Sequence, residues 1–133
     1  MNRTEVFAII FERNQGAILH AVDGLTHTEG LLQLPGDSNC MNWVLGHIAT
    51  YRDGMLADIG LEEYMSEEEV SLYGSGSSPI NIDSPAVDFD RLVELQKLTF
   101  DGLYNWLKSN PNDLDKATRD DMPFKKGYGG YWG

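Results

Sequence analysis

The chain has 133 residues, of which 41% are hydrophobic and 11% aromatic, and it carries a formal net charge of −11. This length and composition predict one folded domain, residues 1–133, with a real core, and they exclude a disordered chain. An acidic surface repels phosphate backbones, so the charge argues against a nucleic acid as a partner.

The cysteine content and the hydropathy of the chain indicate its cellular compartment. The single cysteine, Cys40, excludes an internal disulfide and a cysteine-rich zinc site, and it suits a reducing cytoplasm. The first apolar run, from Val6 to Phe11, is short and flanked by charges, which argues against a signal peptide. No segment approaches the ~20 apolar residues of a membrane span. We therefore expect a cytoplasmic protein with no membrane partner.

The first expected helix spans residues 3–22. Its apolar stripe, which we expect to be buried, holds Phe7, Ile10, Phe11, Asn14, Ile18, Ala21 and Leu25. His20 lies well away from that stripe by the helical period and is expected to be exposed. Gly24 ends the helix and leaves His27 in a loop. Neither histidine is therefore expected to be a metal ligand.

The second expected helix spans residues 40–58. The turn at Pro35-Gly36 precedes it, and Asp37, Ser38 or Asn39 is the expected cap. Its expected buried face holds Cys40, Val44, Ile48, Tyr51 and Met55, and its opposite flank holds Asn42, Thr50 and Asp53. Gly54 predicts a close helix contact, because glycine there costs about 1 kcal/mol relative to alanine.

His47 lies at the edge of the expected buried face, near Trp43 and Tyr51. From the residues alone, two interpretations stay open. One is a histidine at the edge of the core that bonds a carbonyl group, and the other is one ligand of a metal ion. Cys40 lies two helical turns away from His47, too far for a thiol–imidazole pair. The catalytic residues, if there are any, are not identified by the sequence.

Ser66-Glu67-Glu68-Glu69 is a capping box that starts a short helix ending by Gly74. A loop follows, and a third long helix runs from residue 85 or 88 to 108. Its expected buried face holds Phe89, Leu92, Gln96, Thr99, Leu103, Trp106 and Leu107. After Leu114 the helical pattern ends, so the C-terminus is expected to be irregular.

The run Asn42-Trp43-Val44-Leu45-Gly46-His47-Ile48 resembles the second helix of the DinB-like (YfiT-like) four-helix bundles. Pro35-Gly36-Asp37-Ser38-Asn39 before it and Tyr51-Arg52-Asp53 after it share this resemblance, as does the run from Met65 to Gly74. The resemblance covers most of residues 3–110. It implies an all-α, antiparallel up-down helical bundle, here with three long helices, one short helix and an irregular C-terminus.

The resemblance also implies a site. In that family, one histidine of the second helix and an H-x-x-x-H pair on the fourth hold a divalent metal. His47 matches the first position, and nothing in this sequence matches the pair. The resemblance thus implies a metal-dependent hydrolase or thiol-dependent transferase, with zinc or nickel and an unknown substrate. The missing pair favours the alternative, a non-catalytic bundle that self-associates or binds a protein.

The apolar stripes of the three expected long helices predict a partner. A four-helix bundle buries its stripes around a shared centre, so three long helices leave one side open. Either the residues after Asn110 cover that side, with Phe124, Tyr128, Tyr131 and Trp132 as plugs, or a second chain does. We expect a two-fold homodimer, the commonest symmetric solution.

Overall fold

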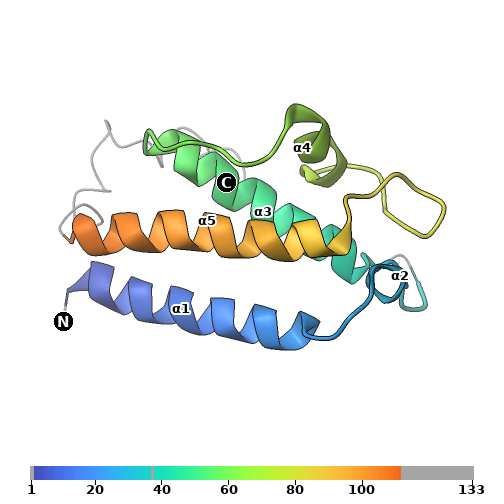
Figure 1. Cartoon of the computed structure of the whole chain (residues 1–133), viewed down its shortest axis with the longest axis horizontal. Coiled ribbons are helices and arrows are strands. Elements are labelled where there is room, and N and C mark those ends of the chain that lie inside the picture. Colours follow the sequence, from blue (N-terminus) through green and yellow to red (C-terminus); the bar gives the residue numbers. More distant parts are fainter. Residues whose placement is uncertain (1, 37, 112–133) are drawn as a thin grey trace.

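The computed structural model describes residues 2–36 and 38–111, and every regular element within them is a helix. Three long helices lie side by side, with α5 between α1 and α3 (Figure 1). The helices are α1 (Arg3–Val22), α2 (His27–Gly30), α3 (Met41–Asp58), α4 (Glu67–Tyr73) and α5 (Phe89–Ser109). The all-α prediction is confirmed. The expected irregular C-terminus lies outside the described residues.

The directions of the long helices depart from the expected alternation. α1 is antiparallel to α5, because Gln15 bonds Gln96 while Tyr104, further along α5, bonds the earlier residue Glu12. α3 and α5 run in the same direction, since α5 begins and ends beside the corresponding ends of α3 (Figure 1). The chain from residue 59 to 88, which includes α4, returns along the bundle before α5 starts. The predicted up-down antiparallel order therefore does not hold for α3 and α5.

Capping explains where several helices begin. The predicted box at Ser66 forms: its Oγ accepts from the amide of Glu69 at 3.1 Å, and a Glu69 carboxylate oxygen accepts from the amide of Ser66 at 3.0 Å. Thr26 and Glu29 make the same pair of bonds, which starts α2. The prediction that His27 lies in a loop was therefore wrong, because Thr26 and Glu29 form a second capping box, which starts a new helical turn after Gly24.

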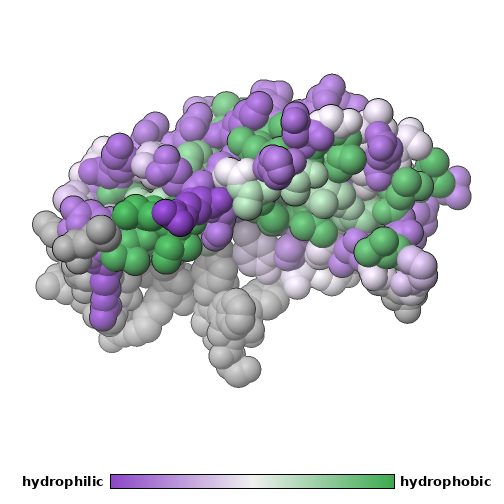
Figure 2. Space-filling view, turned by 90° about the horizontal axis from the view of Figure 1, so that it is seen from below, coloured by the Kyte–Doolittle hydropathy of each residue, from purple (hydrophilic) through white to green (hydrophobic). Residues whose placement is uncertain are grey.

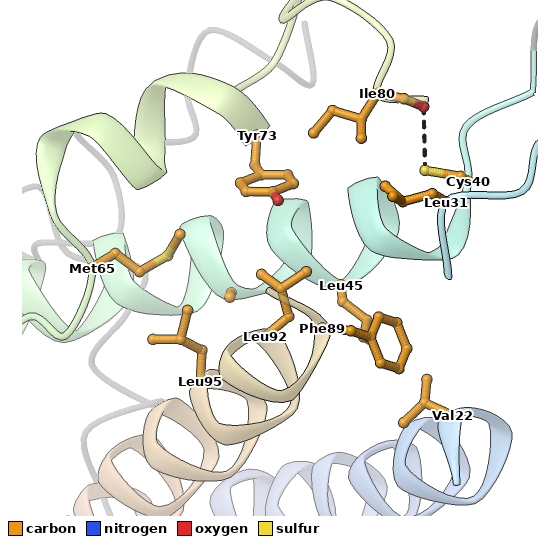
Figure 3. Close-up of a cluster of buried hydrophobic side chains, with 11 residues drawn as sticks. Val22, Leu31, Cys40, Leu45, Met65, Tyr73, Ile80, Phe89, Leu92 and Leu95 are labelled. Atoms are coloured by element: carbon orange, nitrogen blue, oxygen red, sulfur yellow. Dashed lines mark hydrogen bonds between the residues drawn. The ribbon is translucent and has the colours of Figure 1, made fainter. Parts of the chain in front are cut away.

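The start of α3 differs from the prediction in another way. Its N-cap is Cys40, whose side chain makes no capping bond, instead of Asp37, Ser38 or Asn39. The Cys40 thiol faces inward, is 2% exposed, and donates to the carbonyl oxygen of Ile80 at 3.3 Å (Figure 3). Burial confirms the prediction that Cys40 belongs to the buried face of this helix.

Tyr73, the last residue of α4, joins that helix to α3 and to the segment just before α5 (Figure 3). Its side chain is fully buried, and its hydroxyl donates to Asn42 Oδ1 at 2.7 Å and accepts from the amide of Val87 at 2.8 Å. Burial raises the pKa of Tyr73 to about 12, so the hydroxyl stays protonated and can donate. The surrounding buried residues are Val22, Leu31, Cys40, Leu45, Ala49, Met65, Ile80, Phe89, Leu92 and Leu95.

The buried face of α1 is not the one predicted, and that of α3 agrees with the prediction only at Cys40, its N-cap. Residues Asn42, Leu45, Gly46, Ala49, Arg52, Asp53 and Leu56 form the buried face of α3. In contrast, Val44 is exposed, while Ile48, Tyr51 and Met55 are half-buried. On α1, Thr4, Ala8, Gln15 and Val22 are buried, whereas Phe7 and Ile10 are exposed. The prediction for α5 was correct apart from Trp106, which is half-buried.

Buried polar partners explain the rotation of α3. The carboxylate of Asp53, 1% exposed, accepts from the amides of Tyr64 at 2.7 Å and Met65 at 3.0 Å. These bonds fix the chain that follows α3 and allow the Asp53 carboxylate to be buried. Without such partners, burial of a carboxylate would be very costly. Apolar spacing alone could not show that Asp53 has such partners.

Two glycines of α3 provide a matched test of this packing. A Cβ at Gly46 would collide with the ring of Tyr73, whereas one at Gly54 would meet no atom of the described residues within 4 Å. The close helix contact predicted at Gly54 is therefore not made by any described helix. We expect Gly46→Ala to lower the free energy of unfolding by about 1–3 kcal/mol through overpacking. Gly54→Ala should raise it by up to about 1 kcal/mol through helix propensity. Urea denaturation at neutral pH measures both, and equal effects would contradict the packing.

Candidate functional site

His47 lies in the middle of a row of aromatic side chains on α3. The imidazole ring stacks on Trp43, with ring centroids 4.5 Å apart and planes at 14°, and meets the ring of Tyr51 edge-on at 4.7 Å. These residues follow at intervals of four, so a helix places them one above the other on one flank. Trp43 Nε1 also donates to Ser77 Oγ at 3.0 Å. The row therefore holds the His47 ring in a fixed plane.

A backbone carbonyl selects the tautomer of the neutral His47 ring. Its Nδ1 lies 2.8 Å from the carbonyl oxygen of Tyr73, the last residue of α4. A carbonyl oxygen only accepts hydrogen bonds, so Nδ1 carries a proton and Nε2 of the neutral ring keeps its lone pair. Metal-binding histidines are commonly oriented by such a bond on the second nitrogen. The same bond is what a histidine at the edge of the core would make, so the geometry fits both interpretations of His47.

The other expected ligand positions do not gather around His47. His20 is exposed in the last turn of α1, as predicted. His27 Nδ1 accepts from the amide of Phe89 at 3.1 Å and lies 3.9 Å from a carboxylate oxygen of Asp88. Within residues 2–36 and 38–111, no three His, Cys, Asp or Glu side chains come together where they could hold a metal ion. In this part of the chain, His47 is one oriented ligand without the others that a metal site needs.

A buried arginine joins the three long helices. Arg52 of α3 is 6% exposed, and its Nη1 donates to Gln15 Oε1 of α1 at 2.7 Å. The same nitrogen lies 3.2 Å from the carbonyl oxygen and 3.3 Å from Oε1 of Gln96 on α5. The ring of Phe11 lies 4.9 Å from the guanidinium carbon. No carboxylate of the described residues pairs with Arg52, so neutral oxygens and an aromatic ring surround its charge.

Burial has an electrostatic cost at Arg52. It lowers the pKa of the guanidinium to about 10, because the charged form loses hydration. The unfolded chain holds this proton more tightly, so the charge opposes folding at neutral pH. That cost falls only as the pH rises through about 10. The sequence did carry a signal for this network: Gln96 and Thr99 occur among the apolar residues of their stripe. The pattern did not identify Arg52 or Gln15 as their partners.

The first half of α1 exposes a large apolar surface. We call this surface the α1 patch, and it consists of Val6, Phe7, Ile9 and Ile10. These four side chains are 42–51% exposed. Seen from below, hydrophobic residues gather over this part of the molecule (Figure 2). Within the described residues, no helix is long and apolar enough to cross a bilayer. Contiguous apolar surface of this kind marks interaction sites on folded proteins.

Comparison with protein-family models, with curated proteins and with solved structures gave no match. The resemblance to the DinB-like bundles therefore stays a prediction from the short runs around His47.

The Arg52 network provides a test of how polar groups contribute to the core. Arg52→Met should lower the free energy of unfolding by about 2–4 kcal/mol, since it leaves the buried Oε1 atoms of Gln15 and Gln96 without a donor. The triple variant Gln15→Leu, Arg52→Met, Gln96→Leu should regain most of that loss, because apolar groups of similar size need no partners. Urea denaturation at pH 7 compares the three proteins. A triple variant less stable than Arg52→Met would contradict the expected cost of the unpaired oxygens.

Proposed function

We propose that this chain is a non-catalytic helical-bundle module that associates with protein through the open side of α1. The α1 patch is the observation that supports this function. α1 is held mainly by α5, and its buried face is made by other residues, chiefly Ala8, Gln15 and Val22. The patch therefore lies outside the core and remains available to a partner.

The partner that we propose is a second copy of the chain, forming a two-fold homodimer. A two-fold axis pairs a patch with itself, so one apolar surface supplies both halves of the interface. Phe7 stacks on Phe11 at 6.2 Å, and Phe11 contacts the ring of Phe100 at 4.8 Å. These contacts support Phe7 from below and leave it 49% exposed. Aromatic residues held in this way are typical anchors of protein interfaces.

Light scattering after size exclusion tests the homodimer. We expect the full chain to elute as a dimer at micromolar concentration. Ile10→Glu places a charge in the patch and should weaken association by about 2 kcal/mol or more, as at interface hot spots. Leu34→Ser is the matched control, because Leu34 is 73% exposed but lies in the segment between α2 and α3. A wild-type monomer at micromolar concentration, or a dimer unaffected by Ile10→Glu, would refute the proposal.

A second candidate function is the metal-dependent hydrolase or thiol-dependent transferase that the family resemblance implies. The orientation of His47 is compatible with it, because the Tyr73 carbonyl binds Nδ1 and leaves Nε2 as a ligand atom. A divalent metal such as zinc or nickel would lower the pKa of a bound water or thiol. The chain's own contribution would be to hold the imidazole in place between Trp43 and Tyr51. The described residues bring no three ligating side chains together, so we derive no catalytic step.

Metal analysis separates the two candidates. The untagged full chain, after dialysis, should hold far less than one zinc or nickel ion, since a stable site needs about three protein ligands. Stoichiometric metal that disappears in His47→Ala and persists in His27→Ala would instead support the enzyme. His27 is a suitable control because its Nδ1 already accepts from the amide of Phe89.

A further inference from the structure

A cavity of about 590 Å³ lies where α1 begins and α5 ends. Its volume is within the range of small-molecule sites, about 300–1,000 Å³. The walls are made by residues from the first two turns of α1, from the last turns of α5, and from the residue that follows Asn110. They are Thr4, Glu5, Ala8, Ile9, Tyr104, Leu107, Lys108 and Pro111. The aromatic row around His47 contributes none of them.

The lining combines apolar walls with one positive charge. Ala8, Ile9 and Leu107 offer aliphatic surface to a ligand. The ammonium of Lys108 lies 5.2 Å from the centroid of the Tyr104 ring, a cation–π contact that holds it at the cavity wall. Among the described residues, no carboxylate forms an ion pair with Lys108. The cavity thus presents an ammonium group without an ion-pair partner among the described residues, with the Glu5 carboxylate elsewhere on the same lining.

A buried hydroxyl in the same lining has no hydrogen-bond partner. Thr4 is 2% exposed, and within the described residues nothing accepts from or donates to its Oγ1. Buried polar atoms are paired in most folded proteins, so an unpaired one indicates a missing group. The Glu5 carboxylate on the same lining accepts from the amide of Asn2 at 2.9 Å in the capping box of α1, and it makes no bond to the Thr4 hydroxyl.

We propose that this cavity binds a small alkyl carboxylate. Its carboxylate group pairs with the ammonium of Lys108, the Thr4 hydroxyl is the second donor of the site, and the alkyl chain packs on Ala8, Ile9 and Leu107. A dicarboxylate fits poorly, because Glu5 places a negative charge on the same lining. The site shares Ile9 with the edge of the α1 patch. Its other lining residues are not part of the patch, so ligand binding here is a function separate from the proposed docking.

Octanoate is a suitable probe for the full chain, with octan-1-ol as its neutral counterpart. We expect calorimetry to show saturable binding of one octanoate per chain, and octan-1-ol to bind at least tenfold more weakly. Lys108→Met should weaken octanoate binding about tenfold, as expected for the loss of one charge-assisted contact. Lys97→Met, which changes an exposed lysine of α5 outside the cavity, should leave it unchanged.

Thr4→Val tests the hydroxyl separately from folding. This variant should raise the unfolding temperature, because it removes an unpaired buried polar atom, and yet weaken octanoate binding severalfold. Amide shifts on titration should appear at Ala8, Ile9 and Leu107. Absence of saturable binding would overturn the proposal. So would equal affinity in Lys108→Met and the wild type, or shifts centred on Phe7 and Ile10, which would indicate adsorption to the α1 patch.

Discussion

The ring of Tyr73 lies so close to Gly46 that position 46 has no room for a side chain. This contact holds the end of α4 against the second turn of α3. From there the Tyr73 hydroxyl reaches Asn42 and the amide of Val87, just before α5 begins, and its carbonyl oxygen binds His47. One residue therefore positions the connection, the start of the third long helix and the candidate ligand. The parallel direction of α3 and α5 follows from it, because it fixes where the returning chain enters α5.

Polar groups inside the bundle select its arrangement. α1 and α3 lie on opposite sides of α5 and are linked through Arg52, Gln15 and Gln96, which exchange bonds at 2.7–3.3 Å. A buried charge without a carboxylate is costly, and apolar replacements are often as stable. The hydrogen bonds of Arg52, however, form only when the three long helices pack in one register. The network therefore lowers the stability of the fold but defines how these helices pack, which their apolar stripes alone do not.

The outward position of α1 accounts for both proposed binding surfaces. A helix held on one side by a single neighbour keeps its other side for contacts beyond the core. Here that side carries the α1 patch, which we propose as the docking surface. The edge that faces the end of α5 forms the cavity with Lys108 and Thr4. A bundle of this kind can serve recognition without a complete catalytic site, because fold and chemistry are set by different residues.

The sequence by itself determined the elements. The spans of the three long helices, the capping box at Ser66 and the buried stripe of α5 could all be read from it, because capping and helical periodicity are local properties. It also singled out His47 and its neighbours Trp43 and Tyr51. The family resemblance, the metal and the homodimer remain predictions.

Only the tertiary structure decided which face of α1 and α3 is buried, and in which direction α5 runs. Both helices carry apolar residues on more than one flank, so the spacing of apolar residues could not show which flank is buried. The choice depends on partners distant in sequence, such as the amides that meet Asp53 and the glutamines that meet Arg52. The environment of His47 has the same origin: the sequence supplied the imidazole, and a carbonyl 26 residues later fixed its proton.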